Sequence, residues 1–246
     1  MAVRLDKYLA QAGIGTRSEV KKLIRSGRVF LGCEAAKRPE DKIEEGMEVF
    51  VDGERVNYSE YEYYMLHKPA GVVSATQDAN DKTVVELITC PHVKELFPVG
   101  RLDKDTEGLL LLTNDGALAH DLLSPKKHVA KRYFVRAAGK IGEEEKTALE
   151  QGVDIGDEKL TKPAKVEKVH GFQREDMWQT ELEIVITEGR YHQIKRMFQA
   201  VGAKVIYLKR LSMGSLALDE TLALGEFRKL TAEEIDGLRK REEKVL

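Results

Sequence analysis

A charged loop between two glycines, Gly100 and Gly108, contains residue types that could carry out chemistry. Arg101 and Asp103 flank Leu102, so both charged side chains can point to one side while the leucine anchors the loop. The loop leads directly into an apolar run, which predicts a buried strand that holds the carboxylate still. A catalytic carboxylate is one interpretation of this pattern, and a turn held by Arg–Asp ion pairs is the other.

The charges are segregated along the chain, although the 246 residues carry a formal net charge of only −2. Residues 1–28 and 188–210 each have an excess of five basic residues, and residues 126–136 have five basic residues and no acid. Acidic residues gather at 34–54 and 143–150. Basic faces on an otherwise balanced body are typical of nucleic-acid binding.

The composition, 42% hydrophobic and 33% charged, predicts a folded protein with a core and a charged surface. The N-terminus has no apolar signal segment, and no run approaches the ~18 apolar residues of a membrane-spanning helix. We therefore expect a cytoplasmic location and no membrane partner. Cys33 and Cys90 allow a disulfide in principle, but free thiols are the better interpretation. No cluster has metal-ligand spacing, so no metal is expected.

The first 58 residues predict a separate small unit. A linker-like polar stretch at residues 57–61 leads from it into the rest of the chain. Apolar spacing over residues 5–9 predicts a short helix, and Thr16 with Glu19 forms a capping box that begins a second one. Short strands are expected at residues 28–31 and 47–51. One edge of the second helix is basic, and its residues are Arg17, Lys21, Arg25 and Arg28. Because solvated helix faces usually mix signs, this edge favours phosphate binding over a plain surface.

Residues 59–246 predict a second domain in which strands and helices alternate irregularly. Strands are expected at residues 63–66, 109–112, 133–136, 181–186 and 204–208. Helices are expected at residues 116–123, 143–151 and 191–200, with a C-terminal helix opened by a Thr231–Glu234 capping box. The absence of a regular βαβ repeat and of a Gly-rich phosphate loop argues against a doubly wound fold. The sequence predicts an α+β class with a mixed, mainly antiparallel sheet flanked by helices.

Part of the N-terminal unit is similar to the RNA-binding domain of ribosomal protein S4 type. The similarity lies in Arg4–Leu9, Gly15–Glu19 and Ile24–Val29. It implies an S4-like α/β module, residues 1–58, that grips structured RNA.

Four segments of the second domain, in order, resemble the motifs of the pseudouridine synthases that act on ribosomal RNA. The central motif is Gly100–Asp103 followed by Thr106–Leu110. The others are Leu66–Val72, Lys131–Tyr133 and Glu188–Phe198. The resemblance implies a pseudouridine synthase catalytic domain that isomerises a uridine without a cofactor.

The resemblance also assigns roles to four residues. Asp103 would be the essential carboxylate that allows the glycosidic bond to break, and Lys195 would pair with it and keep it ionised. Tyr133 would stack on the uracil and help to remove the C5 proton. Arg101 would help to hold the target nucleotide out of the RNA helix. Taken singly, Tyr133 could equally be an ordinary strand aromatic and Lys195 an ordinary surface lysine. The resemblance does not make His67 or His192 essential, and Trp178 is interpreted as a packing residue.

Basic residues in both domains are candidates for holding RNA phosphates. They are Arg4, Lys7, Arg17, Lys21, Arg25, Arg28, Lys131, Arg132, Arg190, Arg196, Lys209 and Arg210.

The string from Tyr191 to Phe198, with lysine at position 195, is most similar to the branch that modifies small-subunit (16S) rRNA. The expected substrate is therefore one uridine in small-subunit rRNA or the assembling subunit, bound by a monomer. A large-subunit (23S) rRNA enzyme of the same branch is an alternative. A second alternative is a non-catalytic RNA-binding protein of ribosome assembly, and a third is an enzyme of small nucleotides. The S4-like module argues against the third, because a mononucleotide has no extended backbone to grip.

Overall fold

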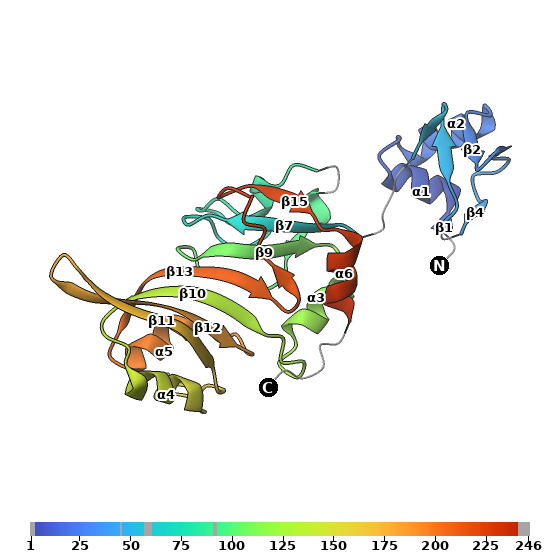
Figure 1. Ribbon diagram of the computed structural model, residues 1–246. Coiled ribbons are helices and arrows are strands. Elements are labelled where there is room, and N and C mark those ends of the chain that lie inside the picture. Colours follow the sequence, from blue (N-terminus) through green and yellow to red (C-terminus); the bar gives the residue numbers. More distant parts are fainter. Residues whose placement is uncertain (1–2, 45, 57–60, 91–92, 241–246) are drawn as a thin grey trace. The chain divides into compact units, whose positions relative to one another are not determined.

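The computed structural model describes residues 3–44, 46–56, 61–90 and 93–240. The chain divides into two compact units, Met1–Tyr61 and Glu62–Leu246 (Figure 1). The sequence places this division at residues 58/59, and most of the predicted linker, residues 57–60, lies outside the described residues. In the described part of the chain, no helix is both long and apolar enough to cross a bilayer.

The first unit has two helices and short strands around a small apolar core. Helix α1 (Leu5–Gln11) is followed by α2 (Arg17–Arg25), which begins with the predicted capping box between Thr16 and Glu19. The paired strands are β1 (Val3–Arg4) with β4 (Lys42–Ile43), and the sheet β3 (Glu34–Ala35), β2 (Val29–Leu31), β5 (Val49–Val51) and β6 (Glu54–Arg55). The core includes Leu5, Leu9 and Ile24, because the apolar stripes of both helices face the strands.

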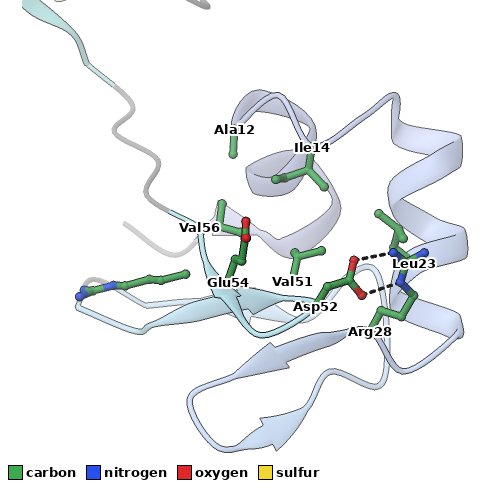
Figure 2. Close-up of a pocket in the computed structure, with 9 residues that line it drawn as sticks. Ala12, Ile14, Leu23, Arg28, Val51, Asp52, Glu54 and Val56 are labelled. Carbon is green, nitrogen blue, oxygen red and sulfur yellow. Dashed lines mark hydrogen bonds and ion pairs between the residues drawn. The ribbon is translucent and has the colours of Figure 1, made fainter.

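The first unit also contains a pocket of about 700 Å³ beside α2 and β5. Figure 2 shows Ile14 and Val51 lining it, with an ion pair between Arg28 and Asp52 at one side.

The second unit is built on a nine-stranded sheet. In sheet order the strands are β11 (Lys165–Arg174), β12 (Met177–Ile186), β10 (Lys131–Ala138), β13 (Lys204–Met213), β9 (Glu107–Thr113), β7 (Tyr63–Lys68) and β15 (Phe227–Lys229), with β14 (Leu216–Ala217) on β13 and β8 (Phe97–Pro98) on β9. Only β13 and β9 are parallel among these pairings. The fold is α+β, and the predicted mixed, mainly antiparallel sheet is confirmed.

Helices cover both faces of this sheet, and each face has its own core. Helices α4 (Glu143–Gln151) and α5 (Gln193–Ala200) pack in one core, and α3 (Gly116–Leu123) and α6 (Ala232–Arg239) pack in the other. Alternate residues of β7 and β9 point into the two cores: Leu110 into the first and Leu111 into the second. A strand buried on both faces has no polar alternation, which explains the continuous apolar run after the charged loop.

The predicted strands and helices are present, and the structure also contains strands that were not predicted, of which β11 is the longest. Helix α5 begins at Gln193 rather than Tyr191, because His192 adopts a left-handed conformation (φ 48°) at its N-cap. Strand β11 was not predicted, because most of its residues are exposed and the strand shows no apolar alternation. Figure 1 shows the β11–β12 hairpin extending beyond the neighbouring strands. Two short 3₁₀ helices, Val85–Leu87 and Val93–Glu95, lie between β7 and β8.

Gly108 allows the parallel contact between β9 and β13. It lies opposite Arg210 with a φ of +104°, and a Cβ there would overlap the backbone of Arg210. We predict that Gly108→Ala lowers the free energy of unfolding by roughly 3 kcal/mol or more, because backbone on both strands must move. Gly202→Ala is the matched control, because its φ is also positive but nothing lies within 4 Å, so about 1 kcal/mol is expected. Equal losses in urea denaturation would contradict this account of Gly108.

Candidate active site around Asp103

The loop that carries Asp103 connects β8 to β9 and is fixed by its neighbours. Leu102 is buried, and Ser74 both donates to its carbonyl and accepts from its N–H, at 3.0 Å each. The Thr106 N–H donates to the Asp103 carbonyl at 3.0 Å, which closes a tight turn. Leu102 therefore anchors the loop as predicted, and Asp103 stays partly exposed beside it.

A buried lysine holds the backbone of this loop from beneath. Lys68 ends strand β7 and is fully buried, and its ammonium is surrounded by backbone carbonyls. These belong to Pro69, Asp103, Lys104 and Thr106, at 3.0, 3.1, 3.3 and 2.8 Å from Nζ. Burial lowers the pKa of Lys68 to about 8, although nearby acidic side chains oppose this shift. Lys68 therefore fixes the position of Asp103 through main-chain contacts.

Helix α5 brings a cation to the Asp103 carboxylate. Nζ of Lys195, in the first turn of α5, lies 3.0 Å from Oδ2 of Asp103 and 2.6 Å from Oδ1 of Asp105. Burial would lower the pKa of Lys195, but its bonds to Asp105 and Asp103 raise it above the usual value. The lysine is thus held charged between the two carboxylates, and the expected Asp103–Lys195 pair is present.

Two aromatic side chains that received no catalytic role in the sequence analysis lie at the same site. Nε2 of His192 is 3.6 Å from Oδ1 of Asp103, and the His192 ring stacks on Tyr191 with centroids 3.9 Å apart. Tyr191 is 77% exposed, an unusual state for a ring of this size. Only the left-handed backbone at His192 brings its side chain here, and the sequence contains no signal for that conformation.

Tyr133 and Arg101 occupy different surroundings from Lys195. Tyr133 is buried on β10 opposite Arg210, and it packs in the core that contains Leu102. Arg101 is exposed. No hydrogen bond or ion pair within the described part of the chain joins either residue to Asp103, so the structure pairs only Lys195 and His192 with that carboxylate.

Several candidate phosphate-binding residues already pair with acidic side chains of the protein. Arg132 pairs with Glu167 and Glu183 at 2.5 and 2.8 Å. The other engaged residues are Arg4 with Asp6, Arg28 with Asp52, and both Arg190 and Arg196 with Asp157. Exposed side chains are Lys7, Arg17 and Arg25, while Lys21 and Lys209 are partly buried. Lys131 is also partly buried, and Arg210 is fully buried.

The described residues contain neither a metal-ligand cluster nor a disulfide. Within the described ranges, no group of three or more His, Cys, Asp or Glu side chains could hold a metal ion. Cys33 and Cys90 are free thiols.

The contacts of Lys68 predict a pH-dependent contribution to stability. Lys68→Met would remove a donor from four carbonyls, two of which also accept a backbone N–H, and should lower the free energy of unfolding by about 3 kcal/mol. Between pH 8 and the unfolded-state pKa of 10.5, folded Lys68 has released a proton that the unfolded chain still binds, so its contribution increases as pH rises. The difference between wild type and variant should grow by about 1 to 3 kcal/mol over this window in urea denaturation. Exposed Lys82→Met is the control, and a flat difference would contradict the assignment.

Comparisons with known proteins agree with this geometry. A profile of the family described as RNA pseudouridylate synthase matches residues 62–200, and an S4 domain profile matches residues 3–49. An RNA pseudouridine synthase of Bacillus subtilis is 51% identical over 235 residues, covering 95% of this chain and 97% of that protein. The ribosomal small subunit pseudouridine synthase A of Haemophilus influenzae is 38% identical, covering 96% and 99%.

A solved structure supports the same relationship. A crystal structure of a pseudouridylate synthase, 39% identical in sequence, covers 96% of this chain and 99% of its own, with a TM-score of 0.65. The profile match, the near full-length relatives and the shared fold lead to one conclusion: this chain belongs to the RNA pseudouridylate synthase family and has an S4 domain ahead of its synthase domain.

Proposed function

We propose that this enzyme isomerises one uridine of small-subunit (16S) rRNA to pseudouridine, with Asp103 as the catalytic carboxylate and no cofactor. The observation that carries the chemistry is the Asp103–Lys195 ion pair of 3.0 Å, on a loop fixed by Lys68. A partly exposed carboxylate held beside a cation can act on a nucleotide that is rotated out of the RNA.

The proposed reaction needs no net oxidation or hydrolysis. The bond between C1′ and N1 breaks, and its electron pair stays with the uracil. Asp103 either forms a bond to the sugar or removes a sugar proton in this step. The uracil then turns and C5 bonds to C1′, while Asp103 leaves the sugar or returns the proton that it took. C5 then loses its proton and N1 gains one, so the net change is an isomerisation. Tyr133 stacks on the uracil and assists this proton loss, and exposed Arg101 holds the nucleotide out of the helix.

The proposed substrate follows from the named relatives. Ribosomal small subunit pseudouridine synthases A of Haemophilus influenzae and Vibrio parahaemolyticus are 38% and 40% identical to this chain over nearly their full lengths. The segment from Tyr191 to Phe198 shares the pattern of that branch at the residues around Lys195. A large-subunit substrate remains the alternative outcome for the assay below.

The S4 domain is proposed to bind the RNA backbone through its exposed basic side chains. Arg17 and Arg25 project from α2, whereas Arg28 is held by Asp52 beside the pocket in Figure 2. The exposed residues can approach phosphates without breaking an ion pair, which makes them the stronger contributors. The same S4 domain favours a polymer over a mononucleotide as the substrate.

Asp103→Asn should abolish the reaction while leaving RNA affinity within about threefold of wild type, because the amide keeps the shape but loses the charge. The measurement is release of tritium from C5-labelled uridine in small-subunit rRNA, with filter binding of the same RNA. Asp105→Asn is the control variant, since its carboxylate also contacts Lys195. It should keep substantial activity.

Each other outcome of this assay has a distinct meaning. Full activity of Asp103→Asn would overturn the catalytic assignment. Release only from large-subunit rRNA would keep the chemistry and correct the substrate. Binding of rRNA without release from any rRNA or assembly particle would favour a non-catalytic binding protein.

RNA binding should depend steeply on salt, and Arg17→Gln with Arg25→Gln should make it less steep. Each lost phosphate contact lowers the slope of log affinity against log salt by about one, so the double variant should lose about two. Titrations between 50 and 200 mM salt, roughly the range over which such contacts weaken, provide the measurement. Arg55→Gln is the control, because Arg55 pairs with Glu48 in the same domain. An unchanged slope in the double variant would exclude these two contacts.

A further inference from the structure

Among the described residues of the catalytic domain, two buried or partly buried cations have no carboxylate partner. Arg210, on β13, is 2% exposed, and its Nε donates to the carbonyl of Leu109 at 2.7 Å. Its Nη2 is buried and has no hydrogen-bond partner among the described residues. Lys131, on β10, is partly buried, and its Nζ donates to the carbonyl of Val129 at 3.1 Å. Two of the three ammonium protons of Lys131 are left for another acceptor.

The two cations affect each other. Burial, followed by the positive charge of Arg210, lowers the pKa of Lys131 to about 8. No ion pair neutralises either side chain within the described part of the chain. Two positive charges that are buried or partly buried without a counter-ion destabilise a fold. Such pairs are therefore often found where a protein binds a negatively charged ligand.

Arg132, the next residue on β10, is a charged side chain that is neutralised within the protein. The side chain of Arg132 alternates to the opposite face of the sheet, where Glu167 and Glu183 neutralise it. On the face that carries Lys131, no described carboxylate forms an ion pair with it. The unpaired positive charge therefore lies on one face of β10. An anion from a bound ligand would neutralise it.

This face lies beside the catalytic loop. In the strand register, Arg210 is opposite Tyr133 on one side and opposite Gly108, where the loop enters β9, on the other. Lys131 lies two residues before Tyr133 and on the same face. The charge of Arg210 also reaches Lys68, the lysine that holds the backbone of Asp103. The unpaired cations and the carboxylate thus belong to one region of the sheet.

We propose that Lys131, with Arg210 behind it, binds the uracil carbonyl oxygen that gains negative charge while the base is detached from the sugar. This inference rests on the proposed function. When the C1′–N1 bond breaks, the electron pair delocalises from N1 onto the uracil oxygens. When C5 bonds to C1′, that charge is used and disappears. Cations at this oxygen stabilise the detached base more than bound uridine, which lowers the barrier.

A backbone phosphate is the other anion that an RNA could offer. Phosphates of an extruded nucleotide stay near the protein surface, whereas the base enters the pocket. The remaining exposure of Lys131 makes it accessible, but Arg210 behind it is covered. The burial of Arg210 therefore favours the uracil oxygen over a phosphate as the ligand. The kinetic test below distinguishes the two.

The test compares Lys131→Met, Lys131→Arg and the exposed control Lys140→Met in tritium release from C5-labelled rRNA. Lys131→Met should lower kcat by about 10²- to 10³-fold, the usual effect of losing one donor to a developing oxyanion, with KM changed by less than about threefold. Lys131→Arg should recover part of kcat because it restores the charge. Lys140→Met should behave as wild type.

Thermal unfolding separates this role from a structural one. Lys131→Met should melt about 2–4 °C above wild type, because it removes a charge that the fold leaves unpaired. A lower melting temperature with lower kcat would instead make Lys131 a structural residue and overturn the proposal.

The remaining outcomes are equally decisive. A raised KM and a weaker salt dependence with unchanged kcat would identify a phosphate and overturn the uracil assignment. Wild-type kinetics in Lys131→Met, with an active wild type, would overturn this inference and leave the proposed function intact. No release by wild type from any rRNA would overturn the proposed function, and this inference with it.

Discussion

The catalytic domain depends on the buried ammonium of Lys68 and the carbonyls gathered around it. A loop that turns sharply beside a sheet leaves carbonyls without partners, and unsatisfied buried carbonyls are costly. Lys68 lies within hydrogen-bond distance of four carbonyls at once, and for those of Pro69 and Thr106 it is the donor that the structure provides. The resulting backbone position places Asp103 next to Lys195. The charge of Lys68 remains in the interior because these carbonyls replace its water. The contacts of Lys68 therefore determine both the conformation of the loop and the position of the Asp103 carboxylate.

The sheet distributes its charges according to what each face must do. One face of β10 carries Arg132 between two glutamates, which is a closed ion-pair network. The other face carries Lys131 near Arg210, and no carboxylate among the described residues pairs with either. Paired charges link neighbouring strands, whereas unpaired cations can interact with a negatively charged ligand. Burying unpaired cations lowers the stability of the fold, and the two large apolar cores on either side of the sheet offset this loss.

Under the proposed function, the two domains divide RNA recognition from chemistry. The S4 domain has a small core of its own and an exposed basic edge on α2, suited to phosphates of a structured RNA. The synthase domain has the carboxylate, the aromatic side chains and the buried cations. Tyr191 and His192, stacked beside Asp103, give the mouth of this site an exposed aromatic surface that an RNA base can contact.

The sequence by itself determined the helices with capping boxes, the strands with continuous apolar runs, and Asp103 with its motif. These features depend on neighbouring residues, whose periodicity and spacing are visible along the chain. Only the tertiary structure decided that Lys68 lies under the loop, that His192 turns toward Asp103, and that Lys131 and Arg210 pair with no described carboxylate. These facts depend on contacts between residues up to about a hundred positions apart and on a left-handed backbone at one residue. No local pattern encodes such contacts, because burial and pairing are properties of the assembled sheet.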